Sequence, residues 1–240
     1  MRSRRRTITP VLPAETATRD GLAYTLWLPT DQPPRSGIVV LHGAGSSKES
    51  HYDYARAALP LGFAVLTFDQ RGHGESEGPM DGRVIEDVAA MASLLRRSLP
   101  DDGPVALRGS SMGGYLALAS APQVDAAAVV AICPASAEGL RRGLTSGRFS
   151  FEADAEALEP VLAANDLHAV LPGLKIPVLL LHAEGDEQVP VEHSRELSRL
   201  LGHPSSRLVA VPGGHHRSVQ HDHDLQALSL RFLQQSSSGG

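Results

Sequence analysis

A serine with a glycine two residues to either side is the first feature of this sequence that could do chemistry. The surrounding segment reads VALRGSSMGG, in which Gly109 and Gly113 flank Ser111 in a G-x-S-x-G pattern. A nucleophile on a sharp strand-to-helix turn needs small residues at these two positions, because larger side chains would overlap the strained backbone. If Ser110 were the centre, the flanking residues would be an arginine and a methionine, which are too large. The pattern therefore predicts that Ser111 attacks a carbonyl carbon.

An activated serine needs a base, and the base needs a carboxylate that fixes its tautomer. In proteins with a nucleophile on this kind of turn, the serine comes first along the chain, the acid second and the histidine last. The apolar run LLLHAEGD contains two carboxylates at its end, Glu184 and Asp186. We favour Asp186, because the Gly-Asp pair marks a tight turn at the carboxyl end of a strand, where open parallel sheets bind ligands. Glu184 remains the rival acid, and Asp186 could instead cap the next helix.

Two consecutive histidines, His215 and His216, end the segment LVAVPGGHH, in which another apolar run passes into a turn. Either imidazole could be the base on chemical grounds alone. Adjacent side chains on a turn point in different directions, so we expect only one of the two to reach Ser111.

The tetrahedral oxyanion of an acyl transfer needs fixed hydrogen-bond donors, each contributing about 2.7–4 kcal/mol. One donor is the backbone N–H of the residue after the nucleophile, here Met112. The second should come from a small-residue turn after an earlier strand, and the segment VVLHGAG offers one. We expect Ala44 to supply it, with Gly43 and Gly45 as alternatives, although the segment could also be a plain turn.

Predicted strands and predicted helices, which could position these residues, alternate along the chain. Apolar runs typical of strands buried on both faces are separated by stretches in which apolar residues recur every three or four positions, as in helices. This alternation predicts one mostly parallel sheet covered on both faces. A hairpin is expected to open the chain, from Thr7–Leu12 and Leu22–Leu28 joined through the sequence RDG. The six further runs are Ile38–Leu41, Ala64–Phe68, Val105–Leu107, Ala126–Ile132, Val178–Leu181 and Leu208–Val211.

Composition narrows the class of protein. The chain has 240 residues, of which 42% are hydrophobic and 20% charged, as is typical of a globular protein. A net charge of -5 gives no overall attraction to nucleic acid. The single cysteine, Cys133, excludes an internal disulfide and a Cys-rich zinc site, and fits a reducing, cytoplasmic compartment. No apolar run approaches the roughly 18 residues that cross a bilayer, so we expect no membrane span.

We expect residues 1–235 to form one domain and residues 236–240 a flexible tail of linker-like composition. The segment 137–177 interrupts the alternation of strands and helices, and within it a helix is expected near Ala153–Ala164. The segment is expected to be either a connecting helix with surface loops or a small lid over the site. Its apolar side chains suggest an apolar acyl pocket for short to medium chains, and they are Leu140, Leu144, Phe149 and Phe151.

The sequence HDHD at 221–224 could suggest metal binding, since imidazole and carboxylate both bind zinc. Alternating side chains at a helix start do not easily converge on one ion, and aspartate suits a cap there. The sequence has neither a Gly-rich phosphate loop nor a dinucleotide fingerprint. We therefore expect neither a metal nor a cofactor.

Five segments resemble motifs of the α/β-hydrolase fold serine hydrolases, and the resemblance extends over roughly residues 20–233. They are LHGAG at 41–45, DQRGHGES at 69–76, GSSMG at 109–113, GDEQVP at 185–190 and PGGHHR at 212–217. The resemblance implies an α/β-hydrolase fold, with a mostly parallel eight-stranded sheet, helices on both faces and at most a small lid insertion.

The same resemblance distinguishes between residues that chemistry alone left open. It aligns His216, not His215, with the catalytic histidine, and it implies structural roles for Asp69 and His73. Relatives that open epoxides or displace halide carry aspartate at the nucleophile position, where this chain has Ser111. That difference argues against both of those reactions.

These observations predict a serine esterase that cleaves short- to medium-chain or aryl acyl esters through an acyl-enzyme on Ser111, with a small-molecule ester as its substrate. It is most similar to small esterases of the cinnamoyl-esterase, monoacylglycerol-lipase and serine-aminopeptidase kind. A thioesterase or an amidase would use the same triad and is the alternative. A binding or scaffold protein that kept the fold is the alternative of another class.

Overall fold

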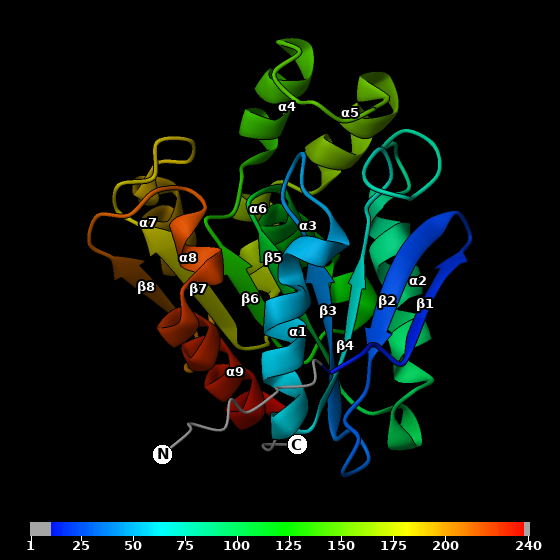
Figure 1. Ribbon diagram of the computed structural model, residues 1–240. Coiled ribbons are helices and arrows are strands. Elements are labelled where there is room, and N and C mark those ends of the chain that lie inside the picture. The colour runs from blue at the N-terminus through cyan, green and yellow to red at the C-terminus, as the bar shows by residue number, and fades with distance from the viewer. Residues whose placement is uncertain (1–10, 238–240) are drawn as a thin grey trace, which may run out of the picture.

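The computed structural model describes residues 11–237 and shows eight strands in one sheet (Figure 1). Their order across the sheet is β1-β2-β4-β3-β5-β6-β7-β8. The pairs β1–β2 and β2–β4 are antiparallel, and all other pairs are parallel, as the sequence predicts. The strands are β1 (Glu15–Arg19), β2 (Leu22–Trp27), β3 (Ser36–Leu41), β4 (Phe63–Phe68), β5 (Val105–Ser110), β6 (Val129–Ile132), β7 (Val178–Ala183) and β8 (Arg207–Val211).

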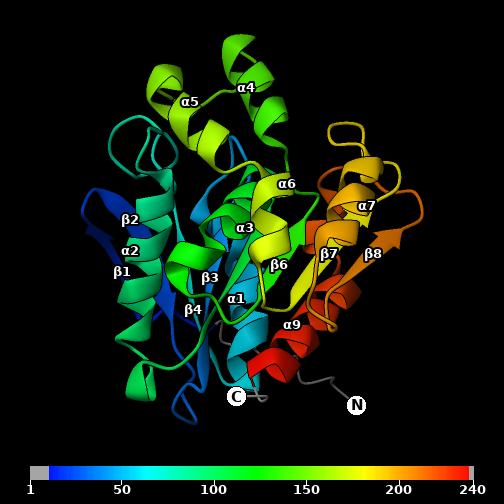
Figure 2. The ribbon, with the colours of Figure 1, turned by 180° about the vertical axis from the view of Figure 1, so that it is seen from behind.

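Helices cover both faces of this sheet. In Figure 1 α1 and α9 lie in front of it, and Figure 2 shows α2, α3, α6 and α7 on the opposite face. The helices are α1 (Tyr52–Ala58), α2 (Val84–Arg96), α3 (Met112–Val124), α4 (Ala137–Thr145), α5 (Ala155–Ala164), α6 (Leu167–Val170), α7 (Val191–Leu200), α8 (Ser218–His221) and α9 (His223–Ser237). Short 3-10 turns are η1 (Lys48–His51), η2 (Leu59–Leu61), η3 (Pro100–Asp102) and η4 (Leu171–Gly173).

The central strands are near-continuous apolar runs because each of their faces packs against a layer of helices. In β3, Val39 and Leu41 belong to the core cluster on the side of α2 and α3. Ile38 and Val40 alternate with them and belong to the cluster on the side of α1 and α9. All six residues of β3 are buried, which is the pattern of a parallel strand covered on both faces.

The first strand of the opening hairpin was predicted too early in the chain, whereas the second, Leu22–Leu28, matches β2. Residues 7–10 lie outside the described residues, and residues 11–12 are not in a strand. The partner of β2 is instead β1, whose sequence ETATR is mostly exposed at the sheet edge. An apolar pattern could not reveal a strand that buries so little. The predicted connection is correct, since Asp20 and Gly21 both have positive φ, 52° and 78°, as a two-residue hairpin turn requires.

Two helices, α4 and α5, project from the carboxyl edge of the sheet at the top of Figure 1. Both begin with a side-chain cap, in which Ser136 Oγ accepts from Gly139 N at 3.0 Å and Asp154 Oδ1 accepts from Ala157 N at 3.0 Å. The sequence predicted α5 but not α4, because α4 has few apolar residues.

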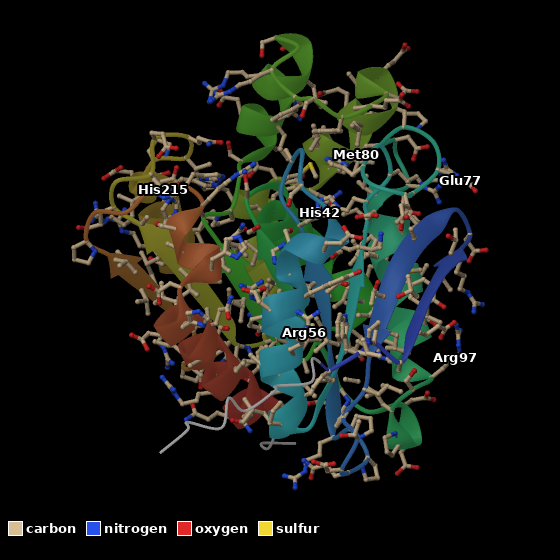
Figure 3. The ribbon with its side chains drawn as sticks, in the orientation of Figure 1. His42, Arg56, Glu77, Met80, Arg97 and His215 are labelled. Atoms are coloured by element: carbon tan, nitrogen blue, oxygen red, sulfur yellow. The ribbon has the colours of Figure 1, made fainter. Side chains whose placement is uncertain are left out.

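The segment between α4 and α5 is hydrogen-bonded to the body of the protein just before α5 begins. Met80 N donates to Glu152 O at 2.9 Å, and Asp154 N donates to Met80 O at 2.8 Å. Figure 3 labels Met80 close to α5. The ring of Phe151 stacks on His73 with the ring centres 4.1 Å apart. These contacts fix the loop that precedes α5 over the carboxyl edge of the sheet.

None of the helices within residues 11–237 combines the length and the apolar character that crossing a membrane requires.

Candidate active site

Ser111 stands between the end of β5 and the start of α3, in a backbone conformation that is rare for a residue with a side chain. Its φ is 53° and its ψ is -118°. Three backbone hydrogen bonds maintain this conformation: Ser111 N donates to Ile132 O at 2.8 Å, while Ser111 O accepts from Tyr115 N and Ala135 N, each at 3.0 Å. Strain of this kind persists only where the surroundings impose it, and it is concentrated at functional sites.

Close backbone packing explains why a glycine stands two residues to either side of Ser111, as the sequence pattern implies. A Cβ at Gly109 would overlap the carbonyl oxygen of Gly113. A Cβ at Gly113 would overlap the carbonyl oxygen of Leu41 at the end of β3. Neither obstacle is a flexible side chain, so the turn that carries Ser111 requires glycine at both positions.

Asp186 and His216 are joined by a short hydrogen bond, in which His216 Nδ1–H donates to Asp186 Oδ2 at 2.7 Å. Both residues are buried. The other carboxylate oxygen, Oδ1, accepts from the backbone N–H groups of Gln188 at 2.8 Å and Val189 at 2.9 Å. With Nδ1 engaged as a donor, the imidazole keeps Nε2 available to accept a proton.

His182, on β7, is a contributor that the sequence analysis did not identify. Its Nε2 lies 2.9 Å from Val189 O and 3.4 Å from Asp186 Oδ2, and its Nδ1 lies 2.7 Å from Ser194 Oγ. The Nε2–H tautomer, which accepts at Nδ1 from the serine hydroxyl, satisfies all of these contacts. The available signal was a polar residue inside an otherwise apolar strand, but its partners are set by the tertiary fold.

These contacts determine the charge of Asp186. Burial alone would raise the pKa of the carboxyl, but hydrogen bonds from His182, His216 and the two backbone N–H groups outweigh burial and hold the pKa well below its usual range. Asp186 is therefore an ionised acceptor at neutral pH.

The rival residues lie elsewhere. Glu184 is exposed and pairs with Arg195 at 2.7 Å. His215 is exposed on the loop between β8 and α8, where Figure 3 labels it. Its backbone N–H donates to Ser218 Oγ at 3.0 Å. Of the two candidate acids and the two candidate histidines, the structure brings Asp186 and His216 together.

Two cavities open beside Ser111. The smaller, of about 260 Å³, is lined by Ser111, His216 and Ala44 among others, and the larger, of about 610 Å³, extends beneath α4. Ser111 and Ala44 line both cavities. No direct hydrogen bond joins the Ser111 hydroxyl to the His216 ring in this structure, an arrangement common in catalytic sites before substrate binds.

The predicted oxyanion donors lie on either side of Ser111. Met112 is the first residue of α3, and Ala44 lies in the turn after β3. Within the described residues, neither N–H donates to an acceptor in a loop or cap. His42 supports this turn, since its Nδ1 lies 2.8 Å from Gly43 O and its Nε2 accepts from Gln70 N at 3.0 Å. Burial lowers the pKa of His42 to about 4, which keeps it neutral in this supporting role.

The loop that follows β4 supports the same turn from the other side. Buried Asp69 accepts from Lys48 N at 2.7 Å and from Lys48 Nζ at 2.8 Å. Arg71 makes a two-pronged contact with Asp87 at 2.9 and 3.0 Å. In the structure Asp69 and His73 contact protein groups and lie outside the linings of both cavities.

The acyl pocket hypothesised from four apolar side chains is mixed in character. Leu140 and Phe149 line the larger cavity, but Arg142 and Arg148 line it with them. Leu144 and Phe151 instead face a small apolar space of about 20 Å³ between α4, α5 and the body of the protein.

Three groups of side chains resemble metal ligands by spacing alone. One of them, formed by Glu49, Asp69 and Glu75, already surrounds Lys48 Nζ at 2.7–2.9 Å. Potential ligand atoms of Cys133, Asp186 and His216 lie within 4.8 Å of one another. The carboxylate and imidazole are already bonded to each other, and burial raises the pKa of the Cys133 thiol, which keeps it protonated. In the HDHD segment Asp222 Oδ1 accepts from Asp224 N at 2.9 Å and Leu225 N at 3.0 Å, so this aspartate caps α9.

Comparison with protein families gives two matches. Residues 32–150 match the serine aminopeptidase S33 family, and residues 157–238 match the TAP-like protein family. The first match includes the turn after β3 and the serine elbow, and the second includes Asp186 and His216.

Curated and solved relatives agree with these matches. The uncharacterised protein YfhR of Escherichia coli O157:H7 is 27% identical over 219 residues, which are 84% of this chain and 72% of that protein. Human monoglyceride lipase is 32% identical over 157 residues, 62% of this chain and 47% of the lipase. The structure of Est1E from Butyrivibrio proteoclasticus with ferulic acid bound superposes with a TM-score of 0.71 at 19% identity, covering 95% of this chain and 100% of Est1E.

The strand order and the family matches lead to one assignment: the chain belongs to the α/β-hydrolase family of serine hydrolases and is related to S33 aminopeptidases, monoacylglycerol lipase and esterases.

Proposed function

We propose that this protein is a carboxylic ester hydrolase in which Ser111 is the nucleophile, His216 the base and Asp186 the residue that orients the base. The observation that carries the proposal is the 2.7 Å hydrogen bond from His216 to Asp186, with the His216 ring lining the same cavity as the strained Ser111. The sequence order of serine, acid and histidine is the order of this fold.

The reaction runs through two steps. His216 Nε2 takes the proton of the Ser111 hydroxyl as the oxygen attacks the ester carbonyl, and the N–H groups of Ala44 and Met112 stabilise the resulting oxyanion. The alcohol leaves with that proton, and the acyl group remains on Ser111. Water, activated by His216, then releases the acid and restores the serine.

The proposed substrates carry short- to medium-chain or aryl acyl groups. The larger cavity combines room for several methylene groups with the apolar surfaces of Leu140 and Phe149. Est1E, which shares the fold, binds an aryl acid, ferulic acid. Thioester or amide cleavage would use the same groups and is the second candidate, supported by the match to the serine aminopeptidase family.

Labelling with a fluorophosphonate followed by peptide mapping tests the proposal. Wild type and Ser110→Ala should carry the label on Ser111, and Ser111→Ala should not be labelled. Equal labelling of Ser111→Ala would show that another residue is the nucleophile. A folded wild-type protein that takes no label would favour the alternative in which the fold serves binding or scaffolding.

A further inference from the structure

Of the described residues that line the two cavities, every one with an ionisable side chain is an arginine or a histidine. Among the described residues, these are Arg142, Arg148, Arg217, His193, His216 and His221, and no aspartate or glutamate lines either cavity. Composition does not explain this, because the chain has 27 acidic and 22 basic residues. The walls around Ser111 therefore carry a local charge opposite to that of the whole chain.

Arg148 has the central position in this set. Among the described arginines, only Arg148 lines both cavities, as Ser111 does. Its exposed side chain makes no ion pair or hydrogen bond with another described residue, and neither does that of Arg217. By contrast Arg142 pairs with Glu138 at 3.3 Å, so part of its charge is already compensated.

The loop that carries Arg148 is fixed in place. Arg148 N donates to Gly143 O at 3.1 Å. The next residue, Phe149, packs against Gly143 and stacks on Phe151, with the ring centres 5.2 Å apart. Phe151 in turn stacks on His73 in the body of the protein. The packed aromatic row thus holds the backbone that carries Arg148 beside both cavities, from where its exposed guanidinium can reach a ligand in either one.

We infer that the preferred ester carries a carboxylate on its acyl chain and that Arg148 binds this carboxylate while Ser111 attacks the ester carbonyl. The inference rests on the proposed esterase function and specifies its substrate class. A planar guanidinium binds a carboxylate through two parallel hydrogen bonds, a match that neutral acyl chains do not offer. Leu140 and Phe149 contact the methylene groups between the two ends, and Arg217 adds attraction from the smaller cavity.

The test compares two substrates with the same acyl chain and leaving group, the 4-nitrophenyl half-ester of adipic acid and the methyl 4-nitrophenyl diester, in which a methyl group removes the carboxylate charge. Initial rates of nitrophenolate release give kcat/KM for each at pH 7.5, with Ser111→Ala protein as the blank. We expect wild type to favour the half-ester at least tenfold. Arg148→Gln should reduce this ratio at least fivefold, mainly by raising KM for the half-ester, and Arg217→Gln should reduce it less.

Arg199→Gln is the matched control, because Arg199 is exposed on α7 and lines neither cavity. It removes the same charge from the molecule and should leave the ratio at its wild-type value. Raising NaCl to 0.5 M should lower the ratio in wild type and have much less effect in Arg148→Gln, since salt screens an exposed ion pair.

A wild-type ratio near or below one, or a ratio that Arg148→Gln leaves unchanged, would overturn the inference. If both esters are nevertheless hydrolysed and Ser111 takes the fluorophosphonate, the esterase function stands without the carboxylate preference. If neither ester is hydrolysed and Ser111 is not labelled, both proposals fail together.

Discussion

At the scale of single residues, the site depends on how Asp186 is held. Two histidines and two backbone N–H groups surround its carboxylate. This set of partners does two things: it keeps the carboxyl ionised, and it aims Oδ2 at His216. An amide in its place would lose the charge and would offer a donor where the N–H groups and His216 also donate.

We therefore expect Asp186→Asn to lower kcat by about 10³–10⁴, because the His216 tautomer is no longer fixed. The measurement is ester hydrolysis at pH 7.5. A loss smaller than tenfold, in a variant whose circular dichroism matches wild type, would contradict the orienting role.

The same substitution makes a prediction about stability and pH. The pKa of Asp186 is lower in the folded than in the unfolded protein, so its contribution to the free energy of unfolding is complete above the unfolded value of about 3.9 and is lost as pH falls through the folded value. Urea unfolding at pH 5 and pH 3 should show a smaller pH-dependent loss for Asp186→Asn than for wild type. Equal losses would mean that this carboxylate is not the source.

The adjacent histidines provide a matched pair of variants. His216→Ala removes the ring bonded to Asp186 and should lower kcat/KM by at least 10³. His215→Ala changes an exposed ring on the same turn and should change kcat/KM by less than about threefold. Similar losses in both would show that the turn, rather than one ring, is what the reaction needs.

At the scale of elements, the elbow between β5 and α3 needs glycine for packing reasons. We expect Gly109→Ala to lower the free energy of unfolding by about 1–3 kcal/mol and to reduce activity, because its Cβ would displace the backbone at Gly113. Gly202→Ala is the control, since a Cβ there would meet nothing within 4 Å. Urea unfolding and fluorophosphonate labelling of both variants make the comparison. Equal stabilities would contradict the packing argument.

The elements also show where prediction from the sequence succeeds and where it fails. The buried strands and the serine elbow are encoded locally, in apolar runs and in the spacing of small residues, and they could be predicted. The edge strand β1 could not be, because its polar, exposed residues carry no apolar signal. His182 could not be assigned either, since its contacts to Val189 and Ser194 arise only when β7 and α7 pack. Choosing His216 over His215 required the family resemblance.

At the scale of the whole molecule, buried neutral histidines make stability depend on pH. Burial lowers the pKa values of His42, His51, His73 and His193, that of His42 to about 4. Below pH 6.5 the unfolded chain binds protons at these positions that the folded protein does not bind. Acidification therefore destabilises the fold, until pH reaches each folded pKa.

Each such histidine removes up to about 1.4 kcal/mol of stability per pH unit below 6.5. We expect the free energy of unfolding, measured in urea, to fall by several kcal/mol between pH 7 and pH 5. This window lies above that of Asp186, so the two effects can be separated. A flat profile between pH 7 and pH 5 would show that these histidines take up protons in the folded protein over the same pH range as in the unfolded chain.

The backbone at Ser111 has one more consequence, for how such a protein can change. Its unusual conformation is imposed by Gly109, Gly113 and hydrogen bonds to the main chain, and none of these involves the Ser111 hydroxyl. The location of the atom proposed to react, the Ser111 oxygen, is thus set by the sheet, while its chemical identity resides in a single side chain. Evolution or design can exchange that side chain and obtain a different reaction at the same point in space, with the rest of the architecture left as it stands.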